Sequence, residues 1–260
     1  MPYNGLRAWR RRGINALKFN RMEKVDIHTK VSSEQVSPAF GNAMLCAVPS
    51  SVVSLEDCVK ALKRFDDNYF DVAIVDPPYG NVAVFENCQP LERKNERPKK
   101  YADKDWDKQK PTAEYWAELF RVSKNQIVWG GNYFTDYLPE SRGWIYWDKN
   151  NGDNNFSDGE LAWTSFNKRL MSFKKNSKAE TRGGKDRFHP TQKPISLYDF
   201  CILNYCADAN LILDTHVGSG SSRIAAAKAG KQFIGFEIDP EYYEKQEKRF
   251  NDWNSQLRMF

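Results

Sequence analysis

The tetrapeptide Asp76-Pro77-Pro78-Tyr79 combines residue types that can hold an amino group on a planar ring. The Asp76 carboxylate and the Pro77 carbonyl can each accept a hydrogen bond from an NH2 group, which favours a pyramidal nitrogen with its lone pair directed outward. The two prolines stiffen the backbone, and the Tyr79 ring can stack on a base. The four residues therefore predict a catalytic site at which an amino group is methylated. Asp-Pro is also common where strands end, so an ordinary turn is the alternative for this motif alone.

Apolar segments that precede the chemical motifs predict the strands that position them. The run 72–75 leads directly into Asp76 and predicts a buried parallel strand. Open α/β sheets bind ligands at the carboxyl ends of such strands. We therefore predict an α/β fold with a twisted, mostly parallel sheet and helices on both faces. The same reasoning predicts further strands at 52–55, 126–129, 144–147, 211–213 and 232–236.

Glycines follow the predicted strand 211–213. Gly218 and Gly220 leave room for a ligand to approach the backbone, and the alanine-rich helix that follows, at 224–229, offers free N–H groups at its N-terminus. The next predicted strand leads into Glu237, about 20 positions past the turn, where a carboxylate can bind the two hydroxyls of a ribose. These features predict a nucleoside ligand.

Missing residues narrow the choice of nucleoside. A dinucleotide fingerprint needs a third glycine, but Arg223 occupies that position, which disfavours an oxidoreductase. A phosphate-binding loop needs a Gly-Lys-Ser/Thr run, and the sequence has none. S-adenosyl-L-methionine fits better. A tight turn without a ligand is the alternative for the glycines alone.

The segment 189–194 supplies further candidates for cofactor binding. Its two prolines predict an extended backbone, and Lys193 can meet the carboxylate at the methionine end of the cofactor. His189 and Thr191 can add hydrogen bonds. A purely structural role for His189 is equally open.

A fourth candidate follows the first predicted strand. Asp57, next to Cys58, can accept a hydrogen bond from the adenine amino group of the cofactor. A helix N-cap explains Asp57 equally well. We include both residues among the predicted cofactor contacts.

Together, these motifs resemble those of the DNA amino-methyltransferases in their permuted beta arrangement. In that family the DPPY element precedes the HPTQKP element and the glycine loop, and here the three occur in that order at 76–79, 189–194 and 214–220. The resemblance covers about residues 52 to 250. It implies a Rossmann-like, S-adenosyl-L-methionine-dependent methyltransferase fold.

The resemblance also implies an activity. It implies transfer of a methyl group from S-adenosyl-L-methionine to the N6 amine of a flipped adenine in double-stranded DNA, because Asp at the first motif position leans toward adenine and Ser toward cytosine. Asp76, Pro77 and Tyr79 are then placed around the base. N4-cytosine methylation, RNA as the substrate and a non-catalytic nucleic-acid-binding module are the alternatives. The predicted cofactor-binding residues are Asp57, Cys58, His189, Thr191, Lys193, Asp214, Gly218, Ser219, Gly220, Ser221 and Glu237.

One departure from the family pattern concerns the residues after Asp214. Such proteins usually have Pro and Phe there, whereas this chain has Thr215 and His216. The first change frees a backbone N–H, and the second replaces an apolar ring by one that can titrate. We assign no role to His216.

Length and composition predict a single catalytic domain. The chain has 260 residues, of which 40% are hydrophobic and 14% aromatic, enough for a core but lean for two large domains. We place the catalytic domain at 52–260, after a basic extension and linker at 1–51. Five cysteines form no CxxC pair, so no metal site or disulfide framework is predicted, and we expect a reducing cytoplasm in a prokaryotic or phage setting. No run of about 18 apolar residues occurs, so no membrane contact is predicted.

A basic segment at 164–187 predicts the surface that contacts DNA. The net charge of the chain is only +5, so the distribution of charge matters more than its total. The place of the segment between two motifs predicts a short target-recognition insertion near 164–188. A target-recognition insertion this small predicts a short recognition sequence or help from a second protomer in a homodimer. We expect the protein to take part in restriction-modification. The predicted nucleic-acid-binding residues are Lys168, Arg169, Lys174, Lys175, Arg182, Lys185 and Arg187.

Overall fold

A computed structural model describes residues 50–80, 109–150, 157–176 and 187–257 of the chain. All of these residues belong to one compact unit, 46–260. The predicted basic extension lies almost wholly outside the described residues. Strand β1 begins at Ser51, one residue before the predicted start of the catalytic domain.

The described residues form one eight-stranded sheet in the order β1-β8-β7-β2-β3-β5-β4-β6. All neighbouring pairs from β1 through β3 are parallel, which confirms the predicted mostly parallel sheet. β5 runs antiparallel to both β3 and β4, and the edge strand β6 pairs in parallel with β4. The strands are β1 (Ser51–Leu55), β2 (Phe70–Val75), β3 (Ser123–Trp129), β4 (Trp144–Asp148), β5 (Gly159–Thr164), β6 (Met171–Lys174), β7 (Leu211–Asp214) and β8 (Gln232–Glu237).

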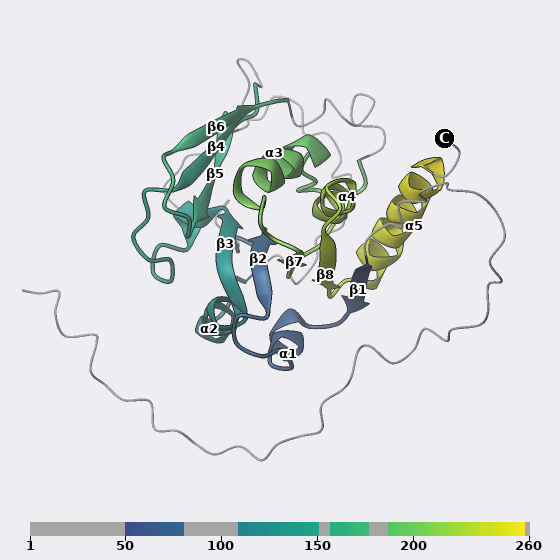
Figure 1. Ribbon diagram of the computed structural model, residues 1–260, viewed down its shortest axis with the longest axis horizontal. Helices are drawn as coiled ribbons and strands as arrows, with labels where there is room; N and C mark the ends of the chain where they lie inside the picture. Colours follow the sequence, from purple (N-terminus) through teal and green to yellow (C-terminus); the bar gives the residue numbers. More distant parts are fainter. Residues whose placement is uncertain (1–49, 81–108, 151–156, 177–186, 258–260) are drawn as a thin grey trace, which may run out of the picture. The chain divides into compact units, whose positions relative to one another are not determined.

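Helices cover both faces of the parallel half of this sheet, as predicted for a Rossmann-like fold. Figure 1 shows α3 and α4 on one face and α1 and α2 on the other. α5 packs beside α4 through Phe250, which contacts Ile224 and Ala227. None of the helices in the described part of the chain combines the length and apolar composition that a membrane span needs. The helices are α1 (Cys58–Leu62), α2 (Ala113–Val122), α3 (Ile195–Tyr205), α4 (Ser221–Lys228) and α5 (Pro240–Leu257), with a short 3-10 helix at Gly131–Tyr133.

Two hydrophobic cores explain why residues 72–75 of β2 are all apolar. Side chains alternate between the faces of a strand, so a strand that is covered on both faces needs apolar residues at every position. Ile74 joins the core beneath α3, which includes Leu197. Ala73 and Val75 join the core beneath α1 and α2, which includes Leu119. The run that ends at residue 75 therefore places the next residue, Asp76, at a fixed edge of the sheet.

The basic segment 164–187 is only partly the insertion that the sequence predicts. Residues 171–174 form β6, which extends the central sheet beyond β4. Residues 177–186 lie outside the described residues. The prediction missed β6 because its four residues, Met171-Ser172-Phe173-Lys174, are too few for a periodic signal.

Candidate active site

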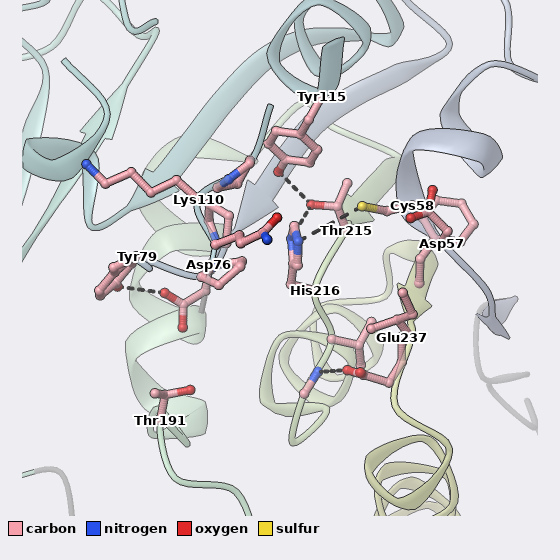
Figure 2. A pocket seen from close by; sticks show the side chains of 18 of the residues that line it. Asp57, Cys58, Asp76, Tyr79, Lys110, Tyr115, Thr191, Thr215, His216 and Glu237 are labelled. Carbon is pink, nitrogen blue, oxygen red and sulfur yellow. Dashed lines mark hydrogen bonds between the residues drawn. The ribbon is translucent and has the colours of Figure 1, made fainter. Parts of the chain in front are cut away.

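A cavity of about 670 Å³ lies at the carboxyl ends of β1, β8, β7 and β2. These strands are neighbours, so the tetrapeptide at 76–79 and the glycine loop meet on one rim of the sheet. Figure 2 shows Asp76 and Tyr79 at one end of the cavity and Asp57 and Glu237 at the other. The predicted residues that line it are Asp57, Cys58, Asp76, Pro77, Pro78, Tyr79, His189, Thr191, Lys193, Gly218, Ser219 and Glu237.

Both carboxylate oxygens of Asp76 have partners within the protein. The Tyr79 hydroxyl donates to Oδ1 at 2.8 Å, and Lys193 Nζ donates to Oδ2 at 2.5 Å. Each oxygen keeps a second lone pair, so the carboxylate can still accept a hydrogen bond from a substrate amine. Burial raises the pKa of Asp76, and while Lys193 opposes the rise, the negative charge of Glu160 adds to it. Lys193 was expected to face a carboxylate of the cofactor, and within the protein it contacts the carboxylates of Asp76 and Glu160.

Backbone geometry on β3 fixes the Tyr79 ring. Gly130 follows β3 with a φ of 67°, and a Cβ there would lie 2.2 Å from Cε1 of Tyr79. Only glycine fits this left-handed position against the ring. The Tyr79 ring stacks on the ring of Tyr133, with the two ring centroids 4.8 Å apart and an angle of 28° between the ring planes. The ring that was expected to stack on a base is thus paired with a second aromatic residue that also lines the cavity.

Glu237 holds the glycine loop at the far end of the cavity. Its Oε2 accepts the Gly218 N–H at 2.8 Å, and its Oε1 accepts the Asp239 N–H at 2.9 Å. Burial raises the pKa of Glu237, and these two backbone N–H groups oppose the rise. A buried carboxylate beside glycine backbone at the end of a parallel strand is a donor and acceptor set that fits the ribose of a nucleoside cofactor. The cradle is tight, because a Cβ on Gly218, whose φ is 53°, would lie 3.3 Å from Nε2 of His189.

Three residues predicted to bind the cofactor do not line the cavity. Asp214 is buried behind the loop, where it accepts from the Ser222 hydroxyl at 2.5 Å and from the His216 N–H at 3.0 Å. Ser221 Oγ donates to the carbonyl of Lys193 at 2.8 Å, and Gly220 takes up the left-handed N-cap position of α4. These three residues shape the loop from behind, and their direct contact with the cofactor stays a prediction.

Asp57 and His189 combine a place in the cavity wall with a structural role. Asp57 is the N-cap of α1, and its side chain accepts the Lys60 N–H at 2.9 Å. His189 Nδ1 accepts the Thr191 N–H at 3.3 Å, and its ring lies 4.3 Å from the ring of Tyr242. Burial lowers the pKa of His189 to about 3, so the ring is neutral at physiological pH. The N-cap that the sequence left as an alternative for Asp57 is confirmed.

A chain of polar side chains along the cavity floor was not predicted. Tyr115 shares a hydrogen bond with Oγ1 of Thr215 at 2.8 Å, and that hydroxyl also contacts Nδ1 of His216 at 2.9 Å. His216 Nε2 lies 4.0 Å from Sγ of Cys58, and Figure 2 shows the whole row. Burial lowers the pKa of His216 to about 4 and raises that of Cys58 to about 12, so both are neutral at physiological pH. The departure at 215–216 was the only sequence signal, and nothing in the sequence pointed to Tyr115.

The predicted DNA-contacting residues are divided by the structure. Lys168 and Arg169 are exposed. Lys174 pairs with Asp148 at 3.2 Å on the sheet edge, and the backbone N–H of Lys175 donates to the Asp148 carbonyl. Arg187 donates to the carbonyls of His189 and Pro190, so its guanidinium supports the loop of the active site. Arg182 and Lys185 lie outside the described residues. Within the described ranges, no group of three or more His, Cys, Asp or Glu side chains is arranged to hold a metal ion.

Fold and site together define an α/β protein in which acidic and aromatic side chains and a glycine loop surround one cavity at the ends of the parallel strands. A family model described as DNA methylase matches residues 92–248. That match spans more than half of the chain, so the chain belongs to the DNA methylase family.

The chain is also similar to individual relatives and to solved structures. The chain is 28% identical to the Type II methyltransferase M2.MboI of Moraxella bovis over 242 residues, covering 75% of this chain and 86% of the relative. It is 26% identical to the Type II methyltransferase M.HinfI of Haemophilus influenzae, covering 75% of this chain and 67% of the relative. Among solved structures, the M1.HpyAVI–SAM complex is 21% identical with a TM-score of 0.48, covering 77% of this chain and 99% of that one. The cytosine-N4-specific PvuII DNA methyltransferase is 14% identical with a TM-score of 0.48, covering 78% and 87%.

Proposed function

We propose that this DNA methylase transfers a methyl group from S-adenosyl-L-methionine to the N6 amine of an adenine in DNA. The observation that carries the proposal is the single cavity that joins Asp76 and Tyr79 to Gly218 and Glu237. A donor and an acceptor must lie side by side for direct transfer, and this cavity provides a place for each. A base flipped out of the duplex, a permuted motif order, a homodimer and a partner restriction enzyme belong to the same proposal.

The chain's own residues prepare the amine. An exocyclic amine on a base shares its lone pair with the ring and is a poor nucleophile, so it needs acceptors that favour a pyramidal nitrogen. Asp76 and the Pro77 carbonyl supply them, and Tyr79 with Tyr133 offers aromatic surface for the base. When it is bound, S-adenosyl-L-methionine supplies an electrophilic methyl group. Glu237 would hold the ribose hydroxyls of the bound cofactor.

Base-resolution modification mapping of DNA from cells that express the protein tests the proposal. We expect N6-methyladenine at a short recognition sequence with the wild type, and a loss of at least about 100-fold in Asp76→Ala, because the amine loses a positioned charged acceptor. The matched control is Asp67→Ala, which removes an exposed aspartate that pairs with Arg121 outside the cavity. We expect that control to methylate like the wild type.

Other outcomes identify the alternative substrates. N4-methylcytosine in place of N6-methyladenine assigns the cavity to cytosine. Unmarked DNA together with methylated RNA moves the activity to the other polymer. Marks that persist in Asp76→Ala remove Asp76 from the chemistry.

A further inference from the structure

Glu160 is a partly buried carboxylate, with 23% of its side chain exposed, that no motif signals and that does not line the cavity. It lies in β5, one residue after the strand begins, and its Oε2 is 3.0 Å from Lys193 Nζ. The same ammonium is 2.5 Å from Asp76 Oδ2. Lys193 is therefore shared between the carboxylate at the substrate end of the cavity and a second carboxylate behind it.

The surroundings of this trio favour the charged forms of Lys193 and Glu160. The Lys193 side chain is only 3% exposed, and although burial disfavours its charge, Asp76 and Glu160 raise its pKa. Burial also opposes ionisation of Glu160, but Lys193 and Lys149, whose Nζ lies 2.6 Å from Glu160, lower its pKa to about 2. An ion that is removed from water needs a partner of opposite charge. Lys149, Glu160, Lys193 and Asp76 alternate in sign, and each forms an ion pair with its neighbour.

We propose that Glu160 is a positioning residue of the methyl-transfer reaction: it anchors Lys193, and through Lys193 it sets the orientation and basicity of Asp76. This inference rests on the proposed function and adds a residue to its machinery. Glu160 lies far from the motifs in the sequence. It reaches Lys193 because its strand, β5, lies next to β3 in the sheet order β3-β5-β4.

The shared ammonium answers a charge problem in the reaction. When the amine nitrogen takes up the methyl group, the new N–C bond forms as the S–C bond of the sulfonium breaks and leaves its electron pair on sulfur. The nitrogen is then positively charged with one proton too many, and that proton must leave. Asp76 takes it on a carboxylate oxygen and becomes neutral, and the proton later passes to solvent. Lys193 would then be a buried cation without a partner, but Glu160 remains as its counter-ion at 3.0 Å. The protonated and deprotonated states of Asp76 thus both leave Lys193 paired.

The groups that face Asp76 from the surrounding elements determine its titration. Lys193 favours the carboxylate, and the Tyr79 hydroxyl donates to it. Glu160 disfavours the charge. The remaining titratable groups that interact with it electrostatically are Tyr115 on α2, Tyr198 on α3 and Asp214 at the end of β7.

The pH dependence of methylation tests the proposal. In Glu160→Gln, the loss of a negative charge lowers the pKa of Asp76, so we expect the acid limb of the single-turnover rate to move down by about one pH unit. The plateau rate should fall roughly tenfold, because a less basic Asp76 is a weaker proton acceptor. Glu160→Asp keeps the charge and should retain the position of the acid limb. The matched control is Glu118→Gln, which removes a carboxylate paired with Arg121 at 2.6 Å and outside the cavity lining, and which should change neither quantity.

A second readout does not depend on activity. The side-chain carboxyl of Asp76 is followed by carbon-13 NMR in protein labelled at aspartate, with Asp76→Asn for assignment. We expect its titration midpoint to fall by about one unit in Glu160→Gln and to stay in place in Glu118→Gln. An unshifted midpoint in folded Glu160→Gln overturns the coupling even if the enzyme methylates DNA. A wild type that carries the coupling but methylates nothing overturns the proposed function instead.

Discussion

Asp76 and Glu237 both place a carboxylate in the same cavity, but the two carboxylates have different surroundings. Asp76 is paired with an ammonium and a hydroxyl and lies beside Tyr79, at the end suited to an amine. Glu237 accepts one backbone N–H from Gly218 in the glycine loop and one from Asp239, which follows β8. A carboxylate whose orientation is fixed by backbone is well placed to bind two hydroxyls. The two carboxylates therefore differ in their environments, which suits each to the role proposed for it.

At the residue scale, we predict that Glu237→Gln weakens S-adenosyl-L-methionine binding about 10- to 100-fold, or about 1.4 to 2.8 kcal/mol. The amide keeps one oxygen for the Gly218 N–H but puts an NH2 donor where the second acceptor stood. Isothermal titration calorimetry measures the change. The Glu118→Gln variant should bind like the wild type, and equal affinities for the wild type and Glu237→Gln would rule out the ribose contact.

At the scale of elements, the turn between β7 and α4 is held in place by hydrogen bonds on the side away from the cavity. Asp214 bonds to Ser222 and to the His216 N–H, so the loop is closed onto the first turn of α4. Burial raises the pKa of Asp214 to about 7, while it lowers that of His216 to about 4. The two shifts have opposite consequences for stability. Between pH 3.8 and about 7, folded Asp214 keeps a proton that the unfolded chain loses, so its contribution to stability falls as the pH rises. Between about pH 4 and 6.5, folded His216 stays neutral while the unfolded chain binds a proton, so its contribution to stability rises with pH.

We predict that His216→Phe lowers the slope of the free energy of unfolding against pH between about pH 4 and 6.5. The pKa of His216 falls from 6.5 to about 4 on folding, so its contribution to stability is fully present above pH 6.5 and is lost as the pH falls toward 4. One proton contributes a slope of about 1.4 kcal/mol per pH unit in that window, and Phe removes it. Urea unfolding of both proteins at a series of pH values measures the slopes. Parallel profiles would show that His216 titrates in the folded protein much as it does in the unfolded one.

At the scale of the whole domain, Arg223 joins three elements that are distant in sequence. Its guanidinium donates to the side chain and carbonyl of Ser51 in β1 and to Gln246 and Glu247 in α5. It also lies 3.9 Å from the centre of the Phe250 ring. The residue that occupies the third-glycine position, and so disfavours a dinucleotide, serves here to hold the edge strand β1 against α4 and α5.

We predict that Arg223→Lys lowers the free energy of unfolding by about 2 to 4 kcal/mol. Lysine keeps the charge but cannot reproduce the planar fork, so buried partners such as Gln246 lose their hydrogen bonds. Urea denaturation measures the loss. The matched control is Arg64→Lys. The Arg64 side chain is 54% exposed and pairs with Glu56, so this substitution should lower the free energy of unfolding by less than about 1 kcal/mol. Equal losses in the two variants would contradict the role of Arg223 as a clamp.

Much of the fold could be predicted because its signals are local. The runs before Asp76 and Glu237 are apolar at successive positions, and the alanines of α4 follow a glycine turn, so burial and backbone conformation are written into short segments. The strands β5 and β6 gave no such signal. Gly159–Thr164 mixes a glycine and a glutamate with apolar residues, and Met171–Lys174 is too short.

The sequence by itself determined the chemical groups and the strand ends that carry them, because residue type and local apolar patterning need no knowledge of distant contacts. Only the tertiary structure decided which groups face each other. Lys193 meets Asp76 across 117 positions, and Tyr115 meets Thr215 across 100. Such pairs depend on strand order and on which side chains share a buried space with too little water to separate them. That is why Lys193 pairs with two carboxylates of the chain, and why Glu160 enters the site without a motif of its own.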